Sequence, residues 1–489
     1  MQNKFKDKEY WPYLFLGSIF LVSRVIYYLS GIRYDISTLE YQWHFIDLPL
    51  LKTDFWRSLF YLHSQPPLLN FITGSVINLF PERYASIFHA LSVICGLFLC
   101  FALFYLMKQL GIPVYINAGL VALFIISPAT ILYENWLYYT YPATTILVIS
   151  AALLPHALKK NGFGFLFFLL LALLSLTWSL FHLIWFVLIT LLVCAARRSI
   201  WKVILISLIP LLLVLGWSIK NQIVFGEFTS STWLGMNLSH LTTSHLSLEK
   251  KNQMISQGEL SAFARIDPFS EVDDYLPLLP KIPETGIPVL DQKTKSNGSP
   301  NYNNITYIQV SNFYLKDALA LIRSEPLLYL KGIGRALFIY FHSSSDYFPL
   351  DGQKKHIDKL ERFWNIVFLG QLQNYRDYQD RLLYRQPGQV GWFIVLAFGL
   401  SMLVGGRAIL DLCKQNEKTS ADKIAIIFIA FNILFVTLAS SMLDMDENNR
   451  FRFIIDPFLL VMVGLGLRYL WESRKKIPQL SSLRGKKSR

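Results

Sequence analysis

The sequence predicts an all-α polytopic membrane protein, and three observations lead to that fold class. First, 53% of the 489 residues are apolar and only 16% are charged, whereas soluble domains carry about 25% charged residues. Second, long apolar runs recur between residues 11 and 471. Third, a backbone inside hydrocarbon must satisfy its polar groups within its own segment, so apolar runs of this length form helices. These observations exclude a single soluble core.

A crossing helix needs about 20 apolar residues, and we expect roughly ten to twelve crossings on that basis. The run at 163–196 is too long for one helix, so we expect two short helices with a tight turn near Trp178. The stretch 66–80 is shorter and is expected to form an interfacial or re-entrant helix. The other crossings are predicted at 11–30, 84–107, 113–129, 142–158, 200–218, 391–408, 422–441 and 453–471.

Basic residues at both ends of the chain predict its orientation. Lysines precede the first apolar run, and the tail at 472–489 is rich in Lys and Arg. Because basic flanks stay in the cytoplasm, we expect both termini there. The loops at 31–83 and 219–325 would then lie on the outer side of a bacterial inner (plasma) membrane, facing the periplasm or the extracellular medium. Nucleic acid is not an expected partner, since no nucleic-acid-binding fold accompanies the tail. Whether 326–343 crosses the membrane stays open, because this run carries Lys331 and Arg335.

Four parts can be recognised along the chain. An N-terminal transmembrane module occupies 1–218 and contains the first outer loop at 31–83. A polar region at 219–325 forms a large outer loop, and loops of that length are usually functional or disordered. A C-terminal transmembrane module follows at 326–471, before the basic tail at 472–489.

The first outer loop carries several acids, of which Asp35 is the candidate catalytic residue. Asp35 follows the first crossing by only a few residues, so it should lie at the membrane–water boundary. There it can reach a substrate with a water-soluble reactive end and a tail in lipid. Sugar transfer to a hydroxyl needs a carboxylate that removes the acceptor proton, which predicts a general base. The alternative is an ordinary solvated acid of a loop.

Three further side chains on the outer side are candidate substrate contacts. His63, in the sequence HSQPP, can contact a phosphate or a sugar hydroxyl, or can instead fix the turn. Glu134 lies among tyrosines and tryptophan, which stack on sugar rings, although such residues also form ordinary interfacial belts. Lys220 can neutralise a phosphate, or can simply extend its amine to the interface.

Arg450 and Arg452 fall on the outer side, where cations are unusual. Guanidinium groups bind phosphate oxygens in pairs, so we expect at least one of them, with Arg450 the main candidate, to bind phosphate. The alternative is local pairing with Asp444, Asp446 or Glu447. The four cysteines show neither metal-ligand spacing nor a disulfide framework, and we expect neither a metal nor a cofactor.

Taken in order, these segments resemble GT-C membrane glycosyltransferases. The first-loop acid, the HSQPP turn, WSIKNQIVFGEF (217–228) and ENNRFRFIIDPF (447–458) carry the resemblance, which spans nearly the whole chain. The most similar branch is the PMT-like one, which includes Rgt-type and aminoarabinose-transferase-like enzymes. That family commonly begins the loop with Asp-Glu or Glu, whereas Asp35 stands alone here, which leaves Asp47 as a rival base.

Two other motifs depart from the family pattern. In its Trp-x-x-Arg-Asn motif, Lys220 replaces the arginine, and a lysine is a point charge without two-pronged recognition. The late pattern of acid, Arg, Tyr and Pro maps onto Glu447, Arg450, Phe451 and Pro457, with Phe in place of Tyr.

The resemblance implies an inverting, metal-independent transferase of GT-C architecture. Its donor would be a polyprenyl-phosphate sugar and its acceptor a hydroxyl of a glycan, lipid or protein, in contact with membrane lipids. Asp35 would be the base, and 219–325 part of the acceptor-side cover. The substrate contacts would be His63, Glu134, Lys220, Arg450 and Glu447.

Two other classes of function remain as alternatives. A transporter or flippase of lipid-linked sugars would hold polar residues mid-span and break helices at the bilayer midplane. A noncatalytic membrane scaffold would leave the clustered outer acids and arginines unexplained.

Overall fold

The structure is a computed structural model that describes residues 3–197, 199–371, 389–414 and 421–484. Within these ranges the regular elements are helices, and extended pairing is confined to two isolated β-bridges. One bridge joins Thr294 to Pro300, and the other joins Asp35 to Trp136. The all-α fold class predicted from the sequence is confirmed.

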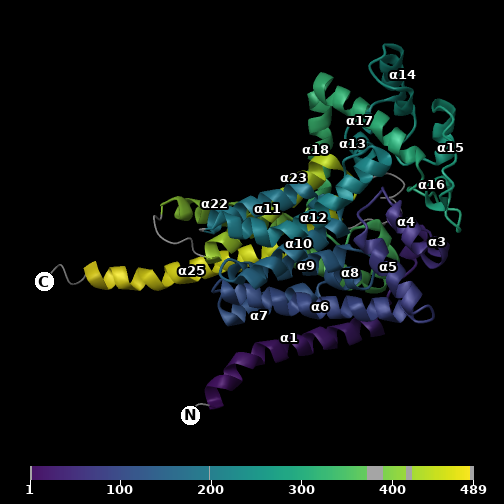
Figure 1. Ribbon diagram of the computed structural model, residues 1–489. Coiled ribbons are helices and arrows are strands. Elements are labelled where there is room, and N and C mark those ends of the chain that lie inside the picture. Colours follow the sequence, from purple (N-terminus) through teal and green to yellow (C-terminus); the bar gives the residue numbers. More distant parts are fainter. Residues whose placement is uncertain (1–2, 198, 372–388, 415–420, 485–489) are drawn as a thin grey trace.

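A bundle of apolar helices forms the body of the molecule (Figure 1). Its helices are α1 (Asn3–Leu29), α6 (Tyr84–Gln109), α7 (Val114–Ile126), α8 (Pro128–Glu134), α9 (Thr140–Ala157), α10 (Asn161–Thr177), α11 (Leu183–Ala196), α12 (Ile200–Phe225), α22 (Trp392–Lys414), α23 (Ala421–Leu443) and α25 (Asp456–Arg484). α9 packs between α6 and α10, and α10 also packs against α12. On the other side of the bundle, α22 packs against α23 and α25.

Five of the described helices, namely α1, α6, α12, α22 and α23, are long and apolar enough to cross a membrane. The pair α7 and α8 would add a sixth crossing, although it is bent by 55° where the sequence predicts one straight helix at 113–129. Pro128, which lacks an N–H, begins α8, and the Ser127 side chain accepts a hydrogen bond from the N–H of Thr130. These residues start a new helix and break the old one.

The run at 163–196 divides into α10 and α11, as predicted, with Trp178 at the turn. α12 differs from the prediction because it continues beyond residue 218 to Phe225. Gly226 follows with φ of +78°, a left-handed conformation that glycine adopts without a Cβ penalty, and this ends the helix.

Short helices of the two outer loops lie at one end of the bundle. The first outer loop contains α2 (Thr38–Tyr41), α3 (Leu48–Thr53), α4 (Phe55–Phe60) and α5 (Leu68–Leu79); the large outer loop contains α13 (Leu234–His240), α14 (Leu248–Ser256), α15 (Val272–Tyr275), α16 (Pro288–Asp291) and α17 (Thr306–Ser324). Figure 1 shows α1 beginning and α25 ending at the opposite end. The large outer loop is ordered around an aromatic core that includes Trp233, Phe269, Tyr275, Tyr302 and Tyr307.

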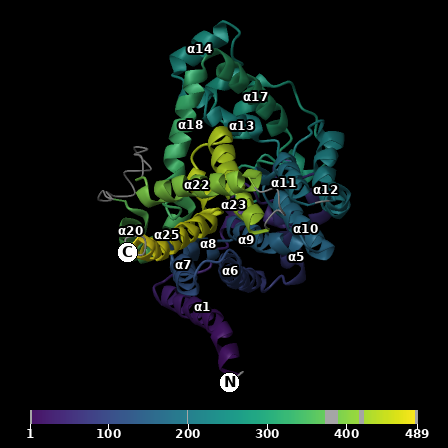
Figure 2. The same ribbon diagram turned by 90° about the vertical axis from the view of Figure 1, so that its left-hand side faces the viewer.

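Four further helices lie beside the bundle: α18 (Pro326–Tyr340), α19 (Asp351–Lys354), α20 (Asp358–Leu369) and α24 (Asn448–Phe453). α18 lies beside α23 (Figure 2) and also contacts α24. Its 15 residues give a length of about 22 Å at 1.5 Å per residue, which is less than the ~30 Å hydrocarbon core. α18 alone is therefore too short to cross a bilayer of that thickness.

The remaining elements are single turns of 3-10 helix. They are η1 (Ser179–Phe181), η2 (Thr243–His245), η3 (Ala262–Arg265), η4 (Leu276–Leu278), η5 (Phe348–Leu350) and η6 (Lys355–Ile357).

Candidate active site

Asp35 lies directly after α1, and its backbone is paired with the turn between α8 and α9. Its N–H donates to the carbonyl of Asn135 at 2.8 Å, and its carbonyl accepts from the N–H of Leu137 at 3.0 Å. Oδ1 accepts hydrogen bonds from the N–H and the hydroxyl of Ser37. Oδ2 has no hydrogen bond to any residue that the structure describes. The loop therefore fixes the half-buried carboxylate and leaves one oxygen available to a ligand.

Trp136, the bridge partner of Asp35, connects this loop to Arg450. The Trp136 ring centroid lies 4.4 Å from that of Tyr138 and 5.7 Å from that of Tyr347. Cζ of Arg450 lies 5.1 Å from the Tyr138 centroid and 5.6 Å from the Tyr347 centroid. Asp35 and Arg450, which are more than 400 residues apart in the chain, are thus connected through the rings of Trp136 and Tyr138.

The guanidinium of Arg450 is buried, with the side chain 1% exposed. It forms an ion pair with Glu447, and Nη1 donates to the hydroxyls of Tyr139 at 3.1 Å and Thr140 at 3.3 Å. Nε has no hydrogen-bond partner among the described residues. We call the rings around this guanidinium the aromatic cage: Tyr138, Tyr139, Trp178, Tyr347 and Phe451.

Glu447 accepts a second hydrogen bond, from the hydroxyl of Tyr347 at 2.6 Å. The pairing of Arg450 with Glu447 is the local arrangement that the sequence left open as an alternative to phosphate binding. The structure thus shows the local pairing, while phosphate binding by Arg450 stays a prediction.

His44 lies against the aromatic cage on the side of the outer loops. Its Nδ1 is 2.6 Å from the hydroxyl of Tyr138, and its ring packs edge-on against Trp233 at 5.3 Å. Burial, together with the nearby charges of Arg450 and Lys295, holds the pKa of His44 well below its usual 6.5. A neutral imidazole is therefore the stable form here. Trp233 and Lys295 both belong to the large outer loop, which covers this side of the cage.

Asp47, the alternative candidate for the base, already accepts hydrogen bonds from another residue of the protein. Its two carboxylate oxygens accept hydrogen bonds from the N–H and the hydroxyl of Ser296, at 2.9 and 2.8 Å. The side chain is buried and joins the first outer loop to the large outer loop. Of the two acids, Asp35 is the one that keeps an oxygen for a ligand.

Glu134 lies inside the bundle, in an ion pair that the sequence analysis did not anticipate. Its carboxylate accepts from Nε and Nη2 of Arg24, at 2.9 and 2.6 Å, and from the hydroxyl of Tyr141 at 2.8 Å. A Cβ added at Gly96 would lie 2.3 Å from Oε2, so the carboxylate is closely enclosed. The expected contact with sugar hydroxyls does not fit this placement, because Arg24 of α1 and Tyr141 already occupy the acid.

His63 and Lys220 lie together, apart from the aromatic cage. His63 is fully buried, with Nδ1 2.8 Å from the Thr232 hydroxyl and Nε2 3.0 Å from the Asn303 carbonyl. Burial is the main cause that lowers its pKa to about 3. Lys220 donates to the carbonyl of Leu62 at 2.6 Å. Both residues therefore hold the first outer loop in place, which is the structural alternative that the sequence left open for His63.

The sequence analysis did not anticipate the cage residue Tyr347 or three residues near the cage, His44, Trp233 and Lys295. In the sequence, His44 lies between the acids Glu40 and Asp47 of the first outer loop. That position was the one feature that could have marked it as a candidate site residue. The other three lie in segments whose position against the cage depends on long-range packing, which no spacing in the sequence encodes.

No protein-family model matches the chain, and no curated protein sequence matches it. Among solved structures, the chain is similar to the oligosaccharyltransferase of Archaeoglobus fulgidus tethered to an acceptor peptide that contains the NVT sequon. The similarity has a TM-score of 0.34 and 10% sequence identity, and it covers 94% of this chain and 50% of that one. The chain thus spans about half the length of that enzyme.

Proposed function

We propose that the chain is a GT-C-type membrane glycosyltransferase that moves a sugar from a polyprenyl-phosphate donor to a hydroxyl of a glycan, lipid or protein acceptor. The observation that carries this proposal is the convergence of Asp35 with Arg450 and Glu447 through Trp136 and the aromatic cage. The outer loops would face the periplasmic or extracellular side, with both termini in the cytoplasm.

The reaction would use Asp35 as general base. Its free Oδ2 would take the proton of the acceptor hydroxyl while the hydroxyl oxygen bonds to the anomeric carbon. The bond between that carbon and the phosphate oxygen would break on the opposite face of the sugar, so the configuration inverts. The phosphate would keep the bonding electrons and leave as polyprenyl phosphate.

Arg450 would stabilise the negative charge that develops on the leaving phosphate. A guanidinium that is already desolvated acts strongly, because the low-dielectric surroundings screen it little and it needs no reorganisation. Glu447 and Tyr139 fix its orientation.

Two features also favour the second candidate, a flippase of lipid-linked sugars: the bend between α7 and α8, and the buried pair of Arg24 with Glu134. The depth of the ion pair argues against a substrate site at the bilayer midplane. Arg24 lies five residues before the last residue of α1, which is about 8 Å at 1.5 Å per residue. The bilayer midplane is roughly 15 Å from either face. The pair therefore belongs to the outer half of the membrane.

One assay separates these functions. Purified protein in detergent receives labelled polyprenyl-phosphate sugar together with a mixture of candidate hydroxyl acceptors, and a parallel sample in vesicles receives the same lipid in one leaflet. Sugar transfer or hydrolysis in detergent supports the proposal. Lipid movement between leaflets without sugar release would support the flippase, and neither activity would support the scaffold.

A further inference from the structure

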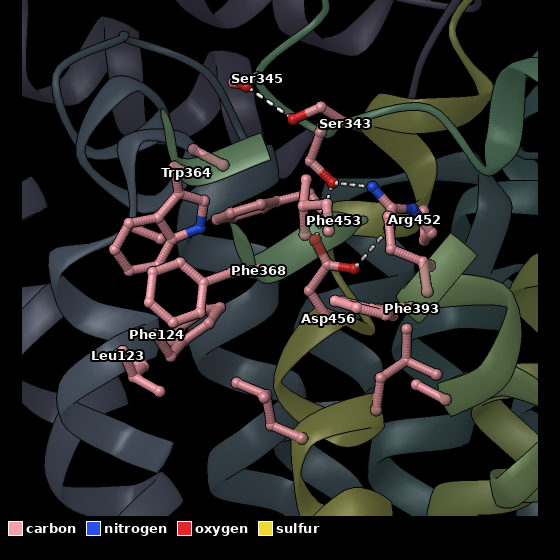
Figure 3. Close-up of a pocket in the computed structure, with 18 of the residues that line it drawn as sticks. Leu123, Phe124, Ser343, Ser345, Trp364, Phe368, Phe393, Arg452, Phe453 and Asp456 are labelled. Atoms are coloured by element: carbon pink, nitrogen blue, oxygen red, sulfur yellow. Dashed lines mark hydrogen bonds and ion pairs between the residues drawn. The ribbon is translucent and has the colours of Figure 1, made fainter. Parts of the chain in front are cut away.

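The cavity of Figure 3, of about 300 Å³, holds a cation whose charge is already balanced. Arg452 lies 3.4 Å from a carboxylate oxygen of Asp456 and donates to the hydroxyl of Ser344 at 2.7 Å. Apolar side chains such as Phe124 and Phe393 form most of the remaining lining. The described residues that line this cavity therefore leave no uncompensated charge for an ionic ligand.

A cluster of cations without acids lies at the inner end of the bundle, which is the end opposite the outer loops. The segment 135–226 contains neither Asp nor Glu. Four of its basic residues form what we call the inner basic patch: Lys159, Lys160, Arg197 and Lys202. None of the four forms an ion pair with a residue that the structure describes. By contrast, Arg468 of α25 is paired with Glu472 at 2.8 Å. Basic residues are common at an inner membrane boundary, but an uncompensated group of them is a candidate anion site.

Close packing at Gly164 of α10 brings three other helices to one point. A Cβ added there would lie 2.6 Å from Ile206 of α12 and 3.4 Å from the carbonyl of Ala157, the last residue of α9. It would also lie 3.7 Å from Nη1 of Arg197, which directly follows α11. α10, α11 and α12 are accordingly packed side by side (Figure 2).

The lysines of the patch surround this point. Lys159 and Lys160 form the turn between α9 and α10, two and three residues after Ala157. Lys202 lies four residues before Ile206, on the same face of α12 and one turn nearer the inner end. All three lysines are exposed, so a ligand can reach their ammonium groups.

Backbone donors add to the patch, because α10 and α12 both begin there. Neither Lys160 nor Ser199, the residues that precede these helices, caps the first turn with its side chain. The first N–H groups of a helix have no partner within the helix, and phosphate oxygens commonly accept hydrogen bonds from them. The patch thus combines positive side chains with uncapped N–H groups.

Exposed apolar side chains lie on the same two helices. Phe163 and Leu166 belong to α10, and Trp201 and Leu205 belong to α12. A phosphate held at the level of the cations would leave its hydrocarbon chains against these side chains. A soluble anion would use the charges alone, so the apolar neighbours favour a lipid.

We propose that the inner basic patch binds an anionic membrane lipid with two phosphate groups, of the diphosphatidylglycerol (cardiolipin) type. Four positive charges without an acid can balance two phosphodiesters, and basic pockets between membrane helices bind such headgroups. Trp178 of the aromatic cage lies at the other end of α10, whose 17 residues span about 26 Å. The site is therefore separate from the candidate active site and does not depend on the proposed reaction.

Titration of the purified full-length chain, followed by native mass spectrometry, tests this proposal. The probes are cardiolipin, phosphatidylglycerol with the same acyl chains, and inorganic diphosphate, which carries charge without chains. We expect cardiolipin to bind most tightly. Each lysine near a charged lipid surface contributes about a fivefold factor in affinity, so the triple variant Lys159→Gln, Lys160→Gln, Lys202→Gln should bind cardiolipin about 100-fold more weakly.

A matched control removes the same charge outside α9–α12. Lys281→Gln, Lys355→Gln and Lys359→Gln together change three exposed lysines of other segments, and this variant should bind cardiolipin as the wild type does. Arginine at the three patch positions keeps the charge and should also preserve tight binding. Cardiolipin should raise the Tm of the wild type but not that of the glutamine variant of the patch, because a ligand stabilises the folded state that binds it.

Three results would overturn the proposal. Wild-type affinity in the glutamine variant of the patch would exclude the patch as the site, and an equal loss in the control would reduce the effect to net charge. Phosphatidylglycerol or inorganic diphosphate binding as tightly as cardiolipin would exclude a lipid with two phosphates as the preferred ligand.

Discussion

The ion pair between Arg24 and Glu134 gives a prediction that separates a structural role from a substrate role. Removing one partner leaves the other charged, buried and unpaired, which costs about 3–5 kcal/mol. Arg24 and Tyr141 supply three hydrogen bonds to the carboxylate, and the Glu134 side chain is 1% exposed. We therefore expect Glu134→Leu and Arg24→Met each to lower the thermal stability of the detergent-solubilised protein strongly.

The double variant should recover most of that loss, because two apolar side chains of similar volume leave no charge uncompensated. The assay is the fraction of monodisperse protein that survives a series of heating steps, followed by sugar transfer at a temperature where all variants are folded. Additive losses in the double variant would refute the pairing. A stable double variant without transfer would instead assign the pair a role in transfer beyond stability.

Three further perturbations follow from the site. His63 has a pKa of about 3 in the folded protein against 6.5 in the unfolded chain. The unfolded chain therefore binds an extra proton as the pH falls below 6.5, and the free energy of unfolding should drop by about 1.4 kcal/mol per pH unit down to about pH 3. His63→Gln should flatten this slope in acid unfolding, whereas an unchanged slope would contradict the assignment of the low pKa to His63. Arg450→Lys keeps the charge but loses the planar donors, so transfer should fall about 100-fold at normal abundance; wild-type transfer rates would exclude a phosphate role. In a double-mutant cycle, Asp47→Ala and Ser296→Ala should show a stability coupling of about 1 kcal/mol, and strictly additive losses would argue against contact between the outer loops.

The fold class and the positions of most bundle helices could be predicted, because apolar run length and the need to satisfy backbone groups in lipid depend on local sequence alone. The break at Ser127 was missed, although the Ser-Pro sequence there carries the signal for a new helix start. The end of α12 was placed too early because apolarity weakens near Trp217, whereas Gly226 decides where the helix stops.

Candidate residues could be predicted where their type is unusual for their place in the chain. Arg450 and Arg452 are unusual on the outer side, and they identified the segment that forms α24. Asp35 was identified as a candidate because it is an acid that directly follows the first apolar run. Partners could not be predicted, because each contact joins distant segments: Arg24 with Glu134, and Tyr347 with Glu447. A single cation near the end of an apolar run, such as Arg24, gives no sign of the acid that it pairs with.

The most direct test of the central claim is the single-turnover rate of sugar transfer by Asp35→Asn, measured with saturating polyprenyl-phosphate sugar. Glu40→Gln, an exposed acid of the same loop, is the matched control. Loss of a general base lowers such rates by about 10²–10⁴-fold, so we predict a loss of that size in Asp35→Asn, with donor binding and abundance unchanged and the control unaffected. A rate within a few-fold of the wild type would contradict the assignment of Asp35 as the base.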